Sequence, residues 1–400
     1  MKKNNNISKG LGSVPDPLER LENYKAQKKA LRKKLDERKK NLIETQSLKV
    51  CKKNIAVLTL NGKLVIILAL FMLASSVQSQ VKVAVIGDYG SDLPQEGMVA
   101  ELVKSFNPIR IVTVGDNNYP NGSEGTIDRN IGKYYSEFIR YYKGTYKYTG
   151  ADGRLYSGSQ DTNRFLPALG NHDGYNSSFA AWDWYFGSAI TLSRLSGNLR
   201  YYNSKIGNSD LVEFFIVNSA YGSGTVMGRF NFEPDGIDSN SVQANWLKSR
   251  LINSTAKWKI VIMHHPPYSS TSAEHLDTYH ILRWNFKKWG ADLLMTGHNH
   301  LYERLNIDSL TITVNGLGGD HKNPFLYTSR SGSIIQYLDN WGAQLLTIYP
   351  DSLNCRFINV NRQVVDNFTL TKGGGSPPPP PTPMTIEQRL RRLEIEVFGN

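Results

Sequence analysis

The hydrophobic positions between residues 81 and 371 predict a series of buried strands. Continuous runs of β-branched and aliphatic residues occur, in order, as VKVAVIG, IRIVTVG, LVEFFIVN, WKIVIMHH, ADLLMTGH and SLTITVNG. Such runs are typical of strands covered on both faces. An amphipathic stretch, Gly97–Ser105, lies between the first two runs and predicts a helix. The alternation of strand, helix and strand therefore predicts an α/β domain with a parallel component.

Two segments interrupt or close this series. Residues 120–165 are rich in Tyr, Gly and Ser, which predicts long surface excursions. Near the end, QLLTIY and CRFINV have the spacing of a hairpin. The sequence KGGGSPPPPPTP then predicts a flexible and extended linker over 372–384. The folded domain is therefore expected to span 81–371.

The residues before this domain predict a basic helical tail and a membrane-targeting segment. Residues 1–60 consist largely of helix formers after a capping sequence at Asp16-Pro17. Residues 61–80 contain an uncharged apolar run, Leu64–Val77, that is shorter than the roughly 17 to 25 residues of a spanning helix. It is closer to a signal-peptide core, cleaved or retained as an anchor, although a buried element of the domain is an alternative. Either membrane interpretation predicts a secreted or membrane-anchored catalytic domain on the extracellular or lumenal side.

Four Asn-x-Ser/Thr triplets beyond this segment fit a glycoprotein. Their asparagines are Asn121, Asn176, Asn253 and Asn367. At the other end of the chain, the sequence predicts a short helix over residues 385–400 with an apolar stripe, which is too short to fold alone. We expect it to self-associate or to bind a partner, with a frayed tail as the alternative.

The positive charge of the chain does not indicate nucleic-acid binding. The formal net charge is +12, but residues 1–63 carry 17 Lys and Arg against 6 Asp and Glu. Nearly all of the excess therefore belongs to the tail, and the main domain is close to neutral. No nucleic-acid partner is expected for it.

Residues of the types that bind metal ions in proteins follow five apolar strands. They occur in the segments GDYG, GDNNY, GNHD, VIMHH and GHNH, and they are Asp88, Asp116, Tyr119, Asn171, His172, His264, His298 and His300. Each alone is compatible with a turn residue or a loop histidine. Five in succession, each after an apolar strand, favour a common site at the carboxyl ends of the strands.

These motifs resemble those of the binuclear metallophosphoesterases and, more closely, the purple acid phosphatases. The segments match GDxG, GDxxY, GNH[ED], VxxH and GHxHxYER over about residues 81–360. Gly90 stands where the wider superfamily has a histidine ligand, and Tyr119 is available instead, as in the purple subgroup. The resemblance implies a four-layer α/β/β/α sandwich of two mixed sheets flanked by helices, here with appended N- and C-terminal helices. It is closest to the compact low-molecular-weight type.

The resemblance also implies a binuclear centre that holds Fe(III) and a divalent ion, which is Fe, Zn or Mn. Asp88, Tyr119 and His300 would bind the ferric ion, and Asp116 would bridge the two metals. The divalent ion would be bound by Asn171, His264 and His298. Hard oxygen anions suit the trivalent ion, whereas imidazoles and an amide oxygen suit the divalent one.

The implied activity is hydrolysis of phosphate monoesters by metal-bound hydroxide, which makes the chain an acid phosphatase acting on phosphorylated small molecules or phosphoproteins. His172 would bind phosphate, and His275 would protonate the leaving group, with His265 as the second choice. Two alternatives remain open. The same metals suit a phosphodiesterase or a nucleotide pyrophosphohydrolase, and an inactive domain would suit a surface interaction protein.

Overall fold

The computed structural model describes residues 80–175, 179–206, 210–220, 235–271, 279–322 and 329–372. The chain divides into two compact units, Met1–Val77 and Gln78–Asn400, and the described residues all belong to the second. The predicted tail and the C-terminal helix fall outside them, as do the linker except for Lys372 and the targeting segment except for Gln80. No helix among the described residues is long and apolar enough to cross a membrane.

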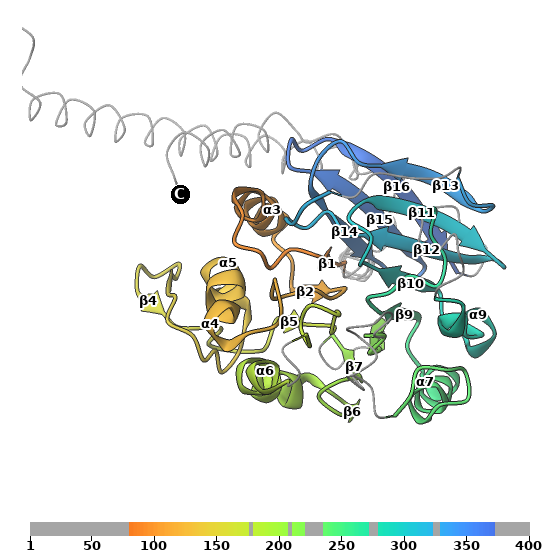
Figure 1. Ribbon diagram of the computed structural model, residues 1–400, viewed down its shortest axis with the longest axis horizontal. Coiled ribbons are helices and arrows are strands. Elements are labelled where there is room, and N and C mark those ends of the chain that lie inside the picture. The colour runs from red at the N-terminus through yellow and green to blue at the C-terminus, as the bar shows by residue number, and fades with distance from the viewer. Residues whose placement is uncertain are drawn as a thin grey trace, which may run out of the picture. The chain divides into compact units, whose positions relative to one another are not determined.

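The domain contains two large mixed sheets, as the fold prediction requires (Figure 1). The first has the strand order β16-β15-β14-β1-β2-β5. Its strands are β1 (Val81–Ile86), β2 (Arg110–Thr113), β5 (Phe165–Leu166), β14 (Gly342–Ile348), β15 (Ser352–Asn359) and β16 (Val364–Thr371). Strands β1, β2 and β5 are parallel, whereas β14 lies antiparallel to β1 and forms the predicted hairpin with β15.

The second sheet has the order β13-β11-β12-β10-β9-β8-β7-β6. Its strands are β6 (Ser196–Gly197), β7 (Tyr202–Lys205), β8 (Val212–Ile216), β9 (Trp258–Ile262), β10 (Leu293–Thr296), β11 (Tyr302–Ile307), β12 (Leu310–Asn315) and β13 (Ser333–Tyr337). Strands β8, β9, β10 and β12 are parallel, and antiparallel strands complete both edges.

The helices cover the outer faces of the two sheets. They are α3 (Pro94–Ser105), α4 (Glu124–Ile127), α5 (Lys133–Tyr135), α6 (Ala180–Ser193), α7 (Val242–Asn253) and α9 (Phe286–Trp289), with short π or 3-10 turns at Asp128–Gly132, Ser136–Phe138 and His280–Leu282. Figure 1 shows α7 and α9 on the side of the second sheet that faces away from α3–α6. The four-layer α/β arrangement predicted from the sequence is therefore confirmed.

Alternate residues of the central strands pack into two different cores. In β9, Ile260 and Ile262 belong to the core between the sheets, whereas Val261 packs under α7 and α9. Successive side chains of a strand point to opposite faces. Both faces are apolar here, so the strands appear in the sequence as continuous rather than alternating hydrophobic runs.

Residues 120–165 correct one of our expectations. They were expected to form surface excursions, but Ile131, Tyr135, Phe138 and Ile139 are at most 3% exposed and pack in the main core. Only part of the segment is a surface structure, including the hairpin of β3 (Tyr148–Thr149) and β4 (Leu155–Tyr156). Two of the tyrosines that suggested a surface excursion, Tyr135 and Tyr142, are core residues, whereas Tyr141 is 55% exposed.

Candidate metal centre

The predicted metal-binding residues lie at the carboxyl ends of parallel strands from both sheets. Asp88 follows β1, Asp116 follows β2 and Asn171 follows β5, all in the first sheet. His264 follows β9, and the segment of His298 and His300 follows β10, in the second sheet. Backbone hydrogen bonds join the two edges, including Gly318 N to Gly87 O (2.9 Å). Two sheets therefore contribute to one site.

Three of these side chains converge on one side of Asp116. The phenol oxygen of Tyr119 lies 3.0 Å from His300 Nε2 and 3.4 Å from Asp88 Oδ1. His300 Nε2 is in turn 3.3 Å from Asp88 Oδ1. These residues form the group predicted to bind the ferric ion.

The other three converge on the Asn171 amide oxygen. His264 Nε2 lies 2.9 Å from Asn171 Oδ1, and His298 Nδ1 lies 3.0 Å from the same atom. Asn171 Nδ2 donates to the Tyr175 hydroxyl at 2.5 Å, which turns the amide oxygen toward the imidazoles. These residues form the group predicted to bind the divalent ion.

Asp116 contacts both groups with a single oxygen. Its Oδ2 accepts a hydrogen bond from the Tyr119 hydroxyl at 3.0 Å and lies 3.2 Å from His264 Nε2. Its other oxygen accepts from the backbone N–H of His172 at 2.9 Å. One carboxylate oxygen therefore contacts both groups, and the role of Asp116 as a bridge between two metals stays a prediction.

The backbone at three of these positions is left-handed. The φ angles are 55° at Asp88, 52° at Asp116 and 68° at His298. Non-glycine residues rarely adopt such angles, and they concentrate at functional sites where the surroundings impose them. Here they turn the chain sharply after the strand and direct the side chains toward one another.

The carboxylates of the site raise the pKa of two of its histidines, whereas burial lowers the pKa of His298 well below its usual range. Burial alone would lower the pKa of His264, but the Asp116 carboxylate raises it to about 9. At His300, burial would again lower the pKa, but the hydrogen bond to Asp88 and the charge of Asp88 raise it to about 9. Burial, with the charges of Asp116 and Asp88, raises the pKa of Tyr119 well above its usual range.

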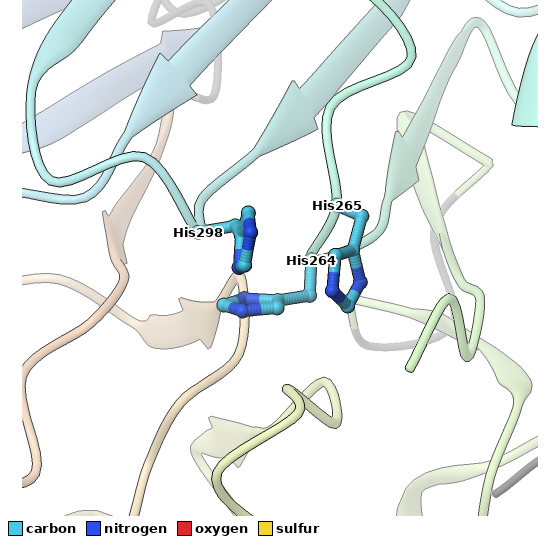
Figure 2. A group of neighbouring side chains, drawn as sticks. All are labelled: His264, His265 and His298. Atoms are coloured by element: carbon cyan, nitrogen blue, oxygen red, sulfur yellow. The ribbon is translucent and has the colours of Figure 1, made fainter. Parts of the chain in front are cut away.

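This donor set fits metal cations. Asp88 and Asp116 are carboxylates that are at most 1% exposed, and buried carboxylates require positive charge nearby. Asp88, Asp116 and His264 form one group of mutually close donor atoms, and His264, His265 and His298 form another. Figure 2 shows these three imidazoles gathered from two segments of the chain. A metal ion bound here would take the place of the proton on His264.

A comparison with protein families agrees with this geometry. The model of the family described as "Calcineurin-like phosphoesterase" matches residues 81–302, which is more than half of the chain. The chain belongs to the calcineurin-like phosphoesterases. Proteins of this family bind a divalent metal centre, and the Asp and His groups described above could hold one. No curated protein matches the sequence.

Solved structures similar to this phosphoesterase share its fold. One is described as "GAP50 the anchor in the inner membrane complex of Plasmodium", with 18% identity and a TM-score of 0.50, over 73% of this chain and 89% of that one. Another is the purple acid phosphatase PPD1 from yellow lupin (Lupinus luteus) seeds, with 16% identity and a TM-score of 0.50. That match covers 74% of this chain and 54% of the lupin chain.

The structure explains the glycine in the first motif of this phosphoesterase. A Cβ atom at Gly90 would lie 1.6 Å from Asn117 O, because the loop that carries Tyr119 packs directly against the glycine. Tyr119 N donates to Gly90 O at 2.7 Å. A histidine at position 90 would therefore have no room, and the loop that excludes it presents Tyr119 instead.

The three histidines predicted to be catalytic have different surroundings. His172 is half-buried at the edge of the site, with Nδ1 2.6 Å from Pro120 O and its ring centroid 4.3 Å from that of Tyr119, at an interplanar angle of 42°. His265 is 1% exposed, with Nδ1 3.3 Å from Ser219 Oγ, and burial lowers its pKa well below the usual range. His275 lies outside the described residues.

Three residues that the sequence did not single out contact the site. Tyr279 places its hydroxyl 3.0 Å from His298 Nε2, the nitrogen opposite the Asn171 amide. Ser219 Oγ accepts hydrogen bonds from the backbone N–H groups of His264 and His265, at 3.0 and 2.9 Å. The Asp320 carboxylate lies 3.8 Å from His300 Nδ1. No motif marks these three residues. Asp320 nevertheless follows the apolar strand β12, and a position after an apolar strand is the signal that revealed the predicted metal-binding residues.

Proposed function

We propose that this calcineurin-like phosphoesterase hydrolyses phosphate monoesters at a binuclear Fe(III)–M(II) centre, as a purple acid phosphatase of the compact type. The observation that carries the proposal is the position of Asp116 Oδ2, 3.0 Å from the Tyr119 hydroxyl and 3.2 Å from His264 Nε2. It joins an oxygen-rich group to a nitrogen-rich one. This division of donors suits a trivalent and a divalent ion.

A metal pair held by these residues would supply Lewis-acid stabilisation of phosphate oxygens and a water of lowered pKa. The chain's own groups would orient and bind. Tyr119, Asp88 and His300 would fix one half of the centre, and Asn171, His264 and His298 the other. His172, half-buried beside Tyr119, is the side chain that we assign to phosphate binding. We assign protonation of the leaving group to His275, with His265 as the second choice.

Replacement of Tyr119 by phenylalanine tests the ferric half. Tyr119→Phe removes the only phenol oxygen that we place among the ligands, so the iron-loaded variant should lose the visible tyrosinate-to-iron band. Phosphatase turnover should fall at least about tenfold, the equivalent of about 1.4 kcal/mol. Metal content and the visible spectrum of the full chain measure both effects.

The matched control for this change is Tyr185→Phe. Tyr185 lies in α6, is 1% exposed and donates a hydrogen bond to Asp128 at 3.1 Å. The change therefore removes a phenol oxygen from a different buried tyrosine. It should keep both colour and turnover. A wild-type protein that binds iron without any colour would refute the tyrosinate assignment.

Two other functions compete with this one. A phosphodiesterase or nucleotide pyrophosphohydrolase would use the same metals, and a panel of mono- and diesters tested across pH would reveal it by a higher kcat/KM for diesters. An interaction role is favoured by the similarity to a structure described as an anchor in a membrane complex. Deletion of residues 1–80 and 372–400 tests whether the appended segments are needed for phosphatase activity. Full phosphatase activity after the deletion would assign the appended segments to location or assembly.

We propose in addition that residues 61–80 target or anchor the domain in a membrane, and that the catalytic domain is extracellular or lumenal. Two sequon asparagines, Asn253 and Asn367, are exposed and thus accessible to glycosylation, and Asn121 is half-buried. Removal of N-linked glycans from the protein made in a eukaryotic host should lower its apparent mass. An unchanged mass together with a cytosolic location would contradict this proposal.

Self-association through residues 385–400 would be seen as a change of oligomeric state when these residues are deleted.

A further inference from the structure

The segment between Tyr119 and β5 sends one buried amide to the loops that carry the proposed ferric ligands. Asn130 lies in the π-helical turn Asp128–Gly132 and is 1% exposed. Its Nδ2 lies 2.6 Å from Gly90 O, 2.8 Å from Tyr119 O and 2.9 Å from Asn118 Oδ1. One amide group therefore contacts both the Asp88 loop and the Tyr119 loop.

The orientation of this amide follows from its acceptors. Two backbone carbonyls and a side-chain oxygen surround the Nδ2 atom, so a flipped amide would place its own oxygen against three oxygens. The –NH2 group must therefore face the loops. The backbone N–H of Tyr119 donates to the same Gly90 carbonyl at 2.7 Å. Next to Tyr119, the two loops are thus joined by this backbone bond and by the Asn130 amide, and Tyr89 N adds a longer bond to Asp116 O at 3.3 Å.

These contacts fix the backbone on both sides of the Tyr119 side chain. Its N–H is bonded to Gly90 O and its carbonyl to Asn130 Nδ2. The ring extends from this anchored residue to a hydroxyl that is 3.0 Å from Asp116 Oδ2 and 3.0 Å from His300 Nε2. A small rotation of the backbone would be amplified at the hydroxyl, because the phenol oxygen is the atom of the residue farthest from the pivot.

We propose that Asn130 is a positioning residue that sets the place of the Tyr119 hydroxyl relative to Asp88 and Asp116. The inference rests on the proposed function for its consequence, since it matters to catalysis only if Tyr119 binds metal. The segment that contains Asn130 is thereby part of the site, although Asn130 itself touches neither substrate nor metal.

The matched control is Asn163, a second buried asparagine of the same segment. It is 3% exposed, and its Nδ2 donates to Phe165 O (2.6 Å), Ser193 Oγ (2.9 Å) and Ala189 O (3.3 Å). Its loss removes the same kind of buried amide clamp, but from the junction of β5 with α6. Asn163→Ala should therefore lower the stability of the fold without affecting Tyr119.

Hydrogen exchange in the metal-free full chain measures positioning without any activity. In Asn130→Ala, peptides that contain the Tyr119 amide should exchange about tenfold faster than in the wild type, the equivalent of about 1.4 kcal/mol of local opening. In Asn163→Ala they should exchange at the wild-type rate. Asn130→Asp, which keeps the shape but places an oxygen against Gly90 O and Tyr119 O, should also speed exchange.

The visible spectrum of the iron-loaded protein supplies a second readout. The tyrosinate-to-iron band should shift in Asn130→Ala, and it should be unchanged in Asn163→Ala at equal loss of melting temperature. Unchanged exchange and an unchanged band in Asn130→Ala would overturn the proposal. Unfolding of both Asn130 variants under conditions where Asn163→Ala remains folded would also overturn it, because the residue would then be a general fold element. Faster exchange in a protein whose wild type has no band would refute the iron site and leave the positioning role intact.

Discussion

Replacing Gly90 with alanine should abolish most of the phosphatase activity. An ideal Cβ at this position would lie 1.6 Å from Asn117 O, 2.2 Å from Asn117 C and 2.9 Å from Asn118 N, all of them backbone atoms. The neighbouring atoms cannot rotate away as a side chain can, so the loop must move. Asp116 and Tyr119 lie on either side of that loop. A displacement of about 1 Å can cost roughly 100-fold in rate, and we expect a loss of at least that size.

Gly125→Ala is the control for the loss of glycine. Gly125 lies in α4 and has no atom within 4 Å of the position that a Cβ would take. Alanine favours a helix, so this variant should fold and turn over phosphate monoesters as the wild type does. Assays of kcat/KM with an aryl phosphate, together with metal content, compare the two. Wild-type activity in Gly90→Ala would mean that the Tyr119 loop is not held where the structure places it.

The surroundings of Gly90 connect two positions that are separate in the sequence motifs. From sequence, Gly90 is the absence of a histidine ligand and Tyr119 is a potential replacement. The structure connects the two positions, because the backbone that lies against Gly90 is the backbone that leads to Tyr119. A change at either position therefore affects the other, which two separate motifs could not indicate.

The strands and their polar ends were predictable because the physical signal is local. An apolar run such as WKIVIMHH contains both the buried strand and the residue that follows it, and the structure places β9 at Trp258–Ile262 with His264 two residues later. The contact between Asp88 and His298, in contrast, is visible only in the folded structure. They are 210 residues apart, yet His298 N donates to Asp88 Oδ2 at 3.0 Å.

The supporting residues were not predictable in the same way. Tyr135 and Phe138 lie in a stretch whose composition is typical of loops, yet both belong to the main core, where the ring of Tyr135 lies 5.8 Å from that of Phe165 in β5. Asn130 is one of many asparagines in the chain, and its role depends on three acceptors from two distant loops. Ser219 likewise has no motif, because its partners are backbone N–H groups. Such contacts are set by tertiary structure and not by residue pattern.

The two histidines of the GHNH motif should have separable roles. His300 Nε2 lies with Tyr119 and Asp88, whereas His298 Nδ1 lies with Asn171. In His300→Ala we expect the ferric ion and the tyrosinate-to-iron band to be lost. In His298→Ala we expect the band to remain, the divalent ion to be depleted and turnover to fall more than about 100-fold, beyond the 10- to 100-fold effects of residues that only support a ligand.

His280→Ala is the control for this pair, since His280 is an exposed histidine in the turn His280–Leu282. It should retain both metals, the band and full turnover. Metal analysis by mass spectrometry and the visible spectrum distinguish the variants even when all turnover is lost. His298 and His300 are two residues apart after the same strand, and this spacing alone would allow both imidazoles to bind the same ion. Identical metal content and spectra for His300→Ala and His298→Ala would show that both histidines bind the same ion. The division of ligands across Asp116 would then be wrong.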